Sequence, residues 1–221
     1  MKKRLTALLL AACMALSLMG LPALATSSDN ETPILTDAPS NPFTDVKSTS
    51  AFLPGILYAV EKGITNGTTS TTFSPSVTCT RAQILTFLWR AWGSPQSDIK
   101  NPFSDLTPEA YYYQAALWAY EKELVSGTTF DAYAPCTRLE AVTYLWKLDG
   151  APQVYETYED TFPFKDLSND ADALNAVAWA AMEKAITNGT SKTTFAPDNV
   201  CTRGQIVTFL YRARELFENQ A

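Results

Sequence analysis

Three arginines stand at equivalent places in the chain and have the chemistry to bind an anionic ligand. Each follows a Cys-Thr pair: Arg81, Arg138 and Arg203. A threonine followed three residues later by Gln or Glu is a capping box, which predicts that each arginine occupies the first position of a helix. A cation there opposes the helix dipole at a cost of about 0.3–1 kcal/mol, which indicates a compensating contact. The helix start and the guanidinium together could bind a carboxylate or a phosphate.

The arginines belong to a segment that occurs three times. Each copy begins with Phe-x-Asp, and the aspartates are Asp45, Asp105 and Asp166. They precede the arginines by 36, 33 and 37 residues. The aromatic six residues after each central glycine is Phe73, Tyr133 or Phe195, which places three missing residues between Pro135 and Cys136. An internal salt bridge from each arginine to one of these aspartates is the alternative to ligand binding, and the spacing leaves both open.

The elements that position the arginines form a helix, a long turn-rich loop and a second helix in each repeat. Apolar spacing predicts first helices over roughly residues 52–62, 112–123 and 171–184. Gly63 is expected to end the first of these in a left-handed conformation, whereas Glu123 and Ala185 predict that the other repeats do not share this ending. A unit of about 55 residues buries little core, so we expect three helical hairpins to pack on one another.

The three repeat cysteines are the next candidates for chemistry. Cys79, Cys136 and Cys201 could meet on a pseudo-threefold axis and bind metal, or two of them could form a disulfide. However, each precedes a capping threonine, where a hydrophobic staple favours a small buried side chain. We therefore predict free buried thiols, no metal site and no cofactor. The five tryptophans are predicted to be core residues rather than sugar-stacking platforms, and the absence of histidine excludes Ser-His-Asp catalysis and His-ligated zinc.

The N-terminus predicts export. Lys2, Lys3 and Arg4 precede an apolar run ending in Ala-Leu-Ala, which indicates a signal peptide over residues 1–25. Lipidation at Cys13 is the alternative, because Leu-Ala-Ala-Cys resembles a lipobox. Removal of the leader leaves 196 of 221 residues and changes the net charge from −6 to −9, which argues against nucleic-acid binding. No later run is long enough to predict a transmembrane segment.

The ordered motifs Phe-x-Asp, Ile-Thr-x-Gly, Thr-Thr-Phe-x-Pro and Thr-Arg-Ala-Gln, repeated three times, resemble a tandem of S-layer homology (SLH) domains. The resemblance implies an all-α fold in which three helix-loop-helix repeats pack as a pseudo-threefold trimer. The expected organisation is a linker over residues 26–41 and repeats over residues 42–95, 101–152 and 162–216. It further implies a non-catalytic surface protein of bacteria that binds the peptidoglycan-linked secondary wall polysaccharide, often through a pyruvylated sugar.

The resemblance also implies which residues bind the ligand in grooves between repeats. The family's Thr-Arg-Ala-Glu arginine corresponds to Arg81, Arg138 and Arg203. Its glutamate position carries Gln83, Glu140 and Gln205, and backbone amides at the helix start and at Gly67, Gly127 and Gly189 are expected to assist. The shorter loop before Arg138 predicts that the second repeat is the weakest site. The alternative function is a structural protein that assembles with other S-layer or envelope proteins; the repeats fill residues 42–215, which leaves no room for an enzyme domain.

Overall fold

The computed structural model describes residues 40–218, and within this range the fold is helical. The described residues form three isolated β-bridges and no β-strand, which confirms the all-α class. The predicted signal peptide, Cys13 and most of the predicted linker lie outside the described residues. The helices are α1 (Leu53–Glu61), α2 (Arg81–Ala91), α3 (Tyr113–Glu121), α4 (Arg138–Leu148), α5 (Tyr155–Tyr158), α6 (Ala171–Ala178), α7 (Arg203–Arg212) and α8 (Glu215–Glu218), with short helical turns η1 (Glu159–Thr161) and η2 (Trp179–Glu183). Among them, none combines the length and apolar character needed to span a bilayer.

The second helix of each repeat begins as predicted. In α2 the Thr80 hydroxyl accepts a hydrogen bond from the Gln83 amide, and the Gln83 side chain accepts one from the Thr80 amide. The same reciprocal pair begins α4 at Thr137 and α7 at Thr202. The capping box therefore fixes all three arginines at the first helical position.

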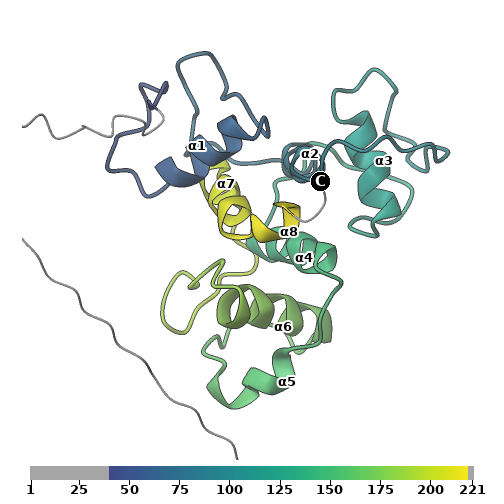
Figure 1. Cartoon of the computed structure of the whole chain (residues 1–221). Coiled ribbons are helices and arrows are strands. Elements are labelled where there is room, and N and C mark those ends of the chain that lie inside the picture. The colour runs from purple at the N-terminus through teal and green to yellow at the C-terminus, as the bar shows by residue number, and fades with distance from the viewer. Residues whose placement is uncertain (1–39, 219–221) are drawn as a thin grey trace, which may run out of the picture. The chain divides into compact units, whose positions relative to one another are not determined.

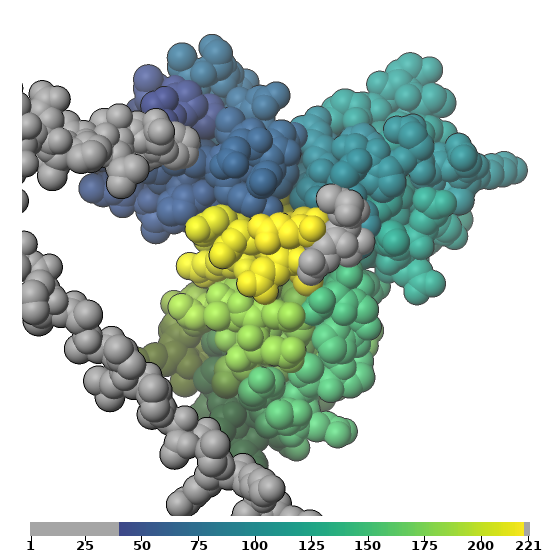
Figure 2. Space-filling view, viewed as in Figure 1, coloured from purple at the N-terminus to yellow at the C-terminus, as the bar shows by residue number. Residues whose placement is uncertain are grey.

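The helices pair across repeats rather than within them. The main contacts join α2 to α3, α4 to α6 and α7 to α1, so each second helix packs against the first helix of another repeat (Figure 1). Across two of these pairs, Trp92 contacts Trp118 at 6.2 Å and Tyr58 contacts Tyr211 at 5.6 Å between ring centroids. Phe217 of the C-terminal segment contacts Trp92 at 6.3 Å, and in the space-filling view this yellow segment lies between the blue surface of the first repeat and the green surfaces below it (Figure 2).

The three cysteines join the repeats through their backbones. The amide of Cys79 donates to the carbonyl of Cys201, that of Cys136 to Cys79, and that of Cys201 to Cys136, at 2.8–2.9 Å. All three thiols are free and buried, as predicted. Burial raises the pKa of the Cys79 thiol to about 12 and that of Cys201 to about 11. Because the thiolate is the reactive form, these thiols are chemically quiet in the folded protein.

Thiol titration checks this arrangement. The native protein lacking residues 1–25 is expected to leave its thiols unmodified by a thiol reagent near neutral pH, because they are buried and protonated. Unfolding without reductant is expected to expose all three at once. Fewer than three titratable thiols in the unfolded chain, or modification in the native state, would contradict the prediction that all three thiols are free and buried.

The structure corrects the predicted register of the second repeat. Asp45 accepts hydrogen bonds from the amides of Phe73 and the next residue, at 2.9 and 2.7 Å. Asp105 makes the same pair of bonds with Phe130 and its successor, so Phe130, not Tyr133, corresponds to Phe73. The missing residues therefore lie between the glycine and this phenylalanine, and Tyr133 is 80 % exposed.

The structure also corrects the predicted ends of the first helices. Gly63 has φ +67°, as expected, but Glu123 (φ 56°) and Ala185 (φ 52°) adopt the same left-handed conformation. The amides that follow, Leu124 and Ile186, donate back into the preceding helix at 2.8 and 2.7 Å. The hydrogen-bonded helix end thus overrides the local preference for glycine, at a cost of about 1–2 kcal/mol for each residue with a side chain.

Replacement of Ala185 by glycine is therefore expected to stabilise the protein. The gain is about 0.5–1 kcal/mol after the larger entropy of glycine in the unfolded chain is subtracted. It corresponds to a rise of about 1–4 °C in melting temperature, measurable by calorimetry. Gly63→Ala is the matched control and should lower the melting temperature by strain alone, because a Cβ at Gly63 would meet no atom within 4 Å.

Candidate functional site

Arg81 lies in an open cavity of about 380 Å³ between the first and second repeats, which we call the Arg81 groove. Its guanidinium is held in place: Nη1 donates to the Phe130 carbonyl at 2.9 Å, and Nη2 pairs with Glu140 at 3.2 Å. The Arg81 side chain is 25 % exposed and that of Glu140 is 31 % exposed, so both are accessible to a ligand. Other lining residues are Leu124, Val125, Ser126, Thr129, Thr137, Leu139, Thr143, Tyr144 and Asp198.

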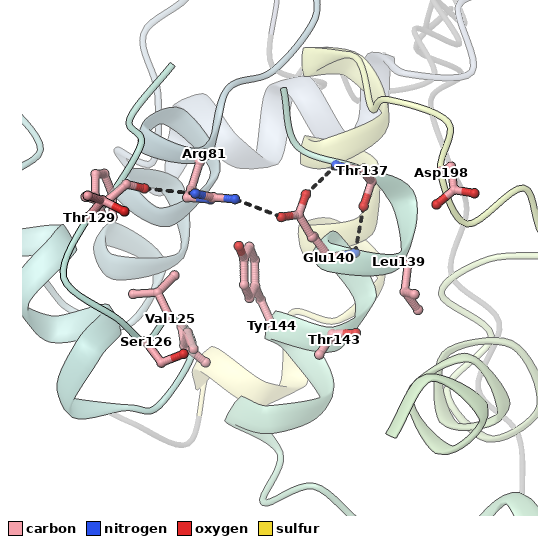
Figure 3. Close-up of a pocket in the computed structure, with 12 residues that line it drawn as sticks. Arg81, Val125, Ser126, Thr129, Thr137, Leu139, Glu140, Thr143, Tyr144 and Asp198 are labelled. Atoms are coloured by element: carbon pink, nitrogen blue, oxygen red, sulfur yellow. Dashed lines mark hydrogen bonds and ion pairs between the residues drawn. The ribbon is translucent and has the colours of Figure 1, made fainter. Parts of the chain in front are cut away.

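Glu140 has two roles at this site. One carboxylate oxygen accepts from the Thr137 amide at 2.8 Å and completes the capping box of α4, while the other pairs with Arg81 (Figure 3). The start of α4 in the second repeat is thereby tied to the start of α2 in the first. The ring of Tyr144, one turn after Glu140, points toward the guanidinium (Figure 3).

Electrostatics keep Arg81 charged. Burial lowers the pKa of its guanidinium, but the nearby Tyr144 and the bond to Glu140 outweigh this and raise the pKa above its ordinary value. The pKa of Tyr144 is also raised, first by burial and then by the charge of Glu140. Arg81 therefore presents a permanent cation next to a neutral phenol.

Arg138 and Arg203 have different surroundings from Arg81, because they are only 5 % and 4 % exposed. Arg138 donates to the Phe195 carbonyl at 3.0 Å, and its guanidinium lies over two phenylalanine rings at 5.0 and 5.6 Å. Arg203 makes the same contacts with the Phe73 carbonyl and with the Phe73 and Phe87 rings. Nη2 of Arg203 is buried without a hydrogen-bond partner among the described residues. Burial lowers the pKa of both guanidinium groups.

The backbone amides predicted to assist binding at the helix starts are already occupied. The Arg81 and Ala82 amides donate to the carbonyls of residues 134 and 132 at 2.9 and 3.0 Å, and the Gln83 amide donates to Thr80. Corresponding bonds begin α4 and α7. These amides therefore do not have a free N–H to donate to a ligand, because neighbouring loops supply the acceptors.

The aspartates proposed as salt-bridge partners bind loop amides instead. Hydrogen bonds from the Phe130 and Asp131 amides hold the pKa of Asp105 below its usual range, against a smaller opposing effect of burial. Asp45 and Asp166 bind the corresponding amides of their own loops. The salt bridge that Arg81 does make is with Glu140, a residue that the repeat spacing did not indicate as its partner.

The remaining predicted site residues divide by repeat. Gln83 and Gln205 complete capping boxes, and neither lines the Arg81 groove. The three glycines have positive φ, as their predicted turns require. A Cβ at Gly67 or Gly189 would come within 2.6 Å of a loop carbonyl, whereas one at Gly127 would meet nothing within 4 Å. The shorter loop thus leaves space beside the Arg81 groove, where the sequence predicted the weakest site.

Several groove residues were missed by sequence reasoning. Tyr144 stands where the other second helices have Phe87 and Phe209, and Val125 stands where the other loops have Thr65 and Thr187. These departures from the repeat pattern could have identified Tyr144 and Val125 as site residues from the sequence. Asp198 comes from the third repeat, and only the folded arrangement brings it to the groove. Residues 40–218 contain no cluster of three or more His, Cys, Asp or Glu side chains suited to a metal ion.

Comparison with known proteins identifies the class. Residues 42–85, 102–142 and 163–207 match the S-layer homology domain. These stretches make up more than half of the chain, so the protein belongs to the S-layer homology domain family and carries three tandem copies, as the motifs predicted. Domains of this family are non-catalytic modules that anchor proteins at the bacterial cell wall.

A curated relative shares the same region. The chain is 33 % identical over 171 residues to an endoglucanase of Bacillus sp. (strain KSM-635). The alignment covers 74 % of this chain and 18 % of the endoglucanase, so the chain spans less than a fifth of that relative. The similarity thus links this chain to one part of a larger bacterial protein.

Proposed function

We propose that this protein binds the peptidoglycan-linked secondary polysaccharide of a bacterial cell wall through the Arg81 groove, without catalysis. The observation that carries the proposal is the accessible Arg81 guanidinium, fixed by the Phe130 carbonyl and Glu140 in a cavity of about 380 Å³. Family membership supports the cell wall as the setting. The predicted leader supports secretion, with the cell wall or S-layer as the final location.

The chemistry of Arg81 supports a carboxylate-bearing sugar as the ligand. A guanidinium has five N–H donors in a planar fork that matches a carboxylate. Its pair with Glu140 is partly exposed, and such pairs contribute about 0–1 kcal/mol, so a ligand carboxylate can replace Glu140. Glu140 and Asp198 line the same groove and would repel a dianion. A pyruvylated sugar carries a single carboxylate and fits this charge balance.

A pseudo-threefold arrangement of the repeats is part of the proposal. The cyclic bonds among the three cysteines and the cyclic pairing of α1 with α7, α2 with α3 and α4 with α6 support it. Such an arrangement places an equivalent junction beside each arginine. We propose the Arg81 groove as the principal site, because Phe rings cover Arg138 and Arg203 at the other two junctions.

Calorimetric titration tests the proposal. Polysaccharide released from purified bacterial walls is the probe, and polygalacturonate is the control for nonspecific attraction to an acidic polymer. We expect saturable binding of the wall polysaccharide and none of the control. Equal binding of both polymers, or of neither, would overturn the proposed function.

A further inference from the structure

A second cavity, of about 720 Å³, adjoins the Arg81 groove. Leu124, Val125 and Ser126 line both cavities, so this segment is their common wall. The second cavity is also lined by Tyr120, Glu123 and Lys147, with Lys100 and Glu121 at the same site. We call it the flanking cavity. A chain molecule held in the Arg81 groove would meet it on passing this segment.

The flanking cavity is specialised compared with its counterparts in the other repeats. In all three, a cation in the last turn of the second helix donates to a carbonyl just after the first helix: Lys147 to Glu123, Arg90 to Ile64 and Arg212 to Ile186. The cavities beside Arg90 and Arg212 are about 340 and 150 Å³. Unlike the flanking cavity, neither adjoins a cavity at its own arginine among the described residues: Arg203, which binds the loop of the first repeat, does not line the former, and Arg138, which binds the loop of the third, does not line the latter.

Two positions in the flanking cavity carry residues that the other repeats lack. Tyr120 corresponds to Val60 and Met182 in the other repeats, and the Glu123 position carries glycine or alanine there. The Tyr120 side chain is 38 % exposed, and its ring is fixed edge-on to Phe103 at 5.6 Å. Tyr120 and Glu123 thus stand where the other repeats have smaller side chains or none, although the cavities there have aromatic rings and carboxylates of their own: Tyr58, Phe217 and Glu218 in one, and Trp179, Glu183 and Glu215 in the other.

These groups suit an uncharged sugar. Two lysines and two glutamates line the cavity, so its formal charge is balanced. A sugar ring has an apolar C–H face and a rim of hydroxyl groups. The rigid, amphipathic ring of Tyr120 offers a surface to the apolar face at low entropic cost, and the charged rim can hydrogen-bond the hydroxyls.

We propose that the flanking cavity binds the sugar unit next to the one held at Arg81, with Tyr120 and Glu123 as the contacting residues. This inference rests on the proposed function, because it requires a polysaccharide in the Arg81 groove. It predicts that affinity rises with fragment length, and that this gain depends on the flanking cavity.

The test uses short and long wall-polysaccharide fragments, separated by size, in calorimetric titrations of the full mature chain. Tyr120→Val introduces the residue that the first repeat carries, and Met182→Val is its control in the third repeat. Glu123→Gly removes the carboxylate while relieving backbone strain, and Ala185→Gly relieves the same strain elsewhere. Melting temperatures accompany each titration.

We expect Tyr120→Val to weaken binding of long fragments about tenfold and Glu123→Gly about threefold to tenfold. Both variants should bind short fragments as the wild type does. The two control variants should bind short and long fragments as the wild type does. Glu123→Gly should weaken binding while raising the melting temperature, a combination that lost structure cannot produce. Long-fragment affinity unchanged in both variants, or equal losses for short and long fragments, would overturn the inference. If the wild type binds neither fragment, the proposed function fails first.

Discussion

Replacement of Arg81 by alanine is expected to weaken wall-polysaccharide binding by about 2–5 kcal/mol, the usual cost of truncating one partner of a charge pair that the bound ligand covers. Its effect on stability should be small, because water in the open cavity can replace Arg81 at the Phe130 carbonyl and a cation at the first helical position opposes the helix dipole. Titration calorimetry measures the binding loss and scanning calorimetry the stability. Lysine should restore binding only in part, since it lacks the planar fork.

Two further variants isolate the role of Arg81. Arg90→Ala removes the same charge from the same helix outside the groove, where Arg90 donates to the Ile64 carbonyl, and should leave affinity unchanged. Glu140→Gln keeps an acceptor for the capping box, as Gln83 and Gln205 do, but removes the competing carboxylate. It should tighten binding of an acidic fragment. Wild-type affinity for Arg81→Ala would refute the site.

Replacement of Arg138 by alanine is expected to act on stability instead. The variant loses the bond to the Phe195 carbonyl, a bond of 3.2 Å to the Thr187 hydroxyl, and the contacts with two Phe rings. A buried carbonyl without a partner and a new cavity together cost about 3 kcal/mol. The melting temperature should fall by about 6–12 °C.

Arg203→Ala is the parallel case and should show a similar loss of stability. The helix-dipole argument alone predicts that removing either arginine leaves stability unchanged or slightly higher. The buried contacts reverse that expectation for Arg138 and Arg203 but not for Arg81. Equal melting temperatures for all three alanine variants would show that burial does not separate the arginines.

Local signals in the sequence predicted the second helices well. The capping boxes at Thr80, Thr137 and Thr202 act within four residues, so neighbouring sequence suffices to place them. The prediction of buried thiols followed from the same capping boxes, because each cysteine directly precedes a capping threonine. The first helices were placed within a few residues of their ends, although the third continues from α6 into the π-helical turn η2.

Features that depend on distant contacts were not predictable from the sequence. The loop of the second repeat offers two aromatics, Phe130 and Tyr133, and only the bonds to Asp105 select Phe130. The left-handed Glu123 and Ala185 are imposed by the helix ends, against residue preference. Sequence reasoning distinguished the three arginines only by loop length, because the difference in their burial comes from side chains of other repeats.

Co-sedimentation with purified walls tests the central claim most directly. The mature protein is mixed with intact walls and with walls stripped of their secondary polysaccharide, next to the Arg81→Ala variant. The account predicts that the wild type sediments with intact walls, stays in solution with stripped walls, and loses most of its binding when Arg81 is replaced. Equal sedimentation with intact and stripped walls would contradict it.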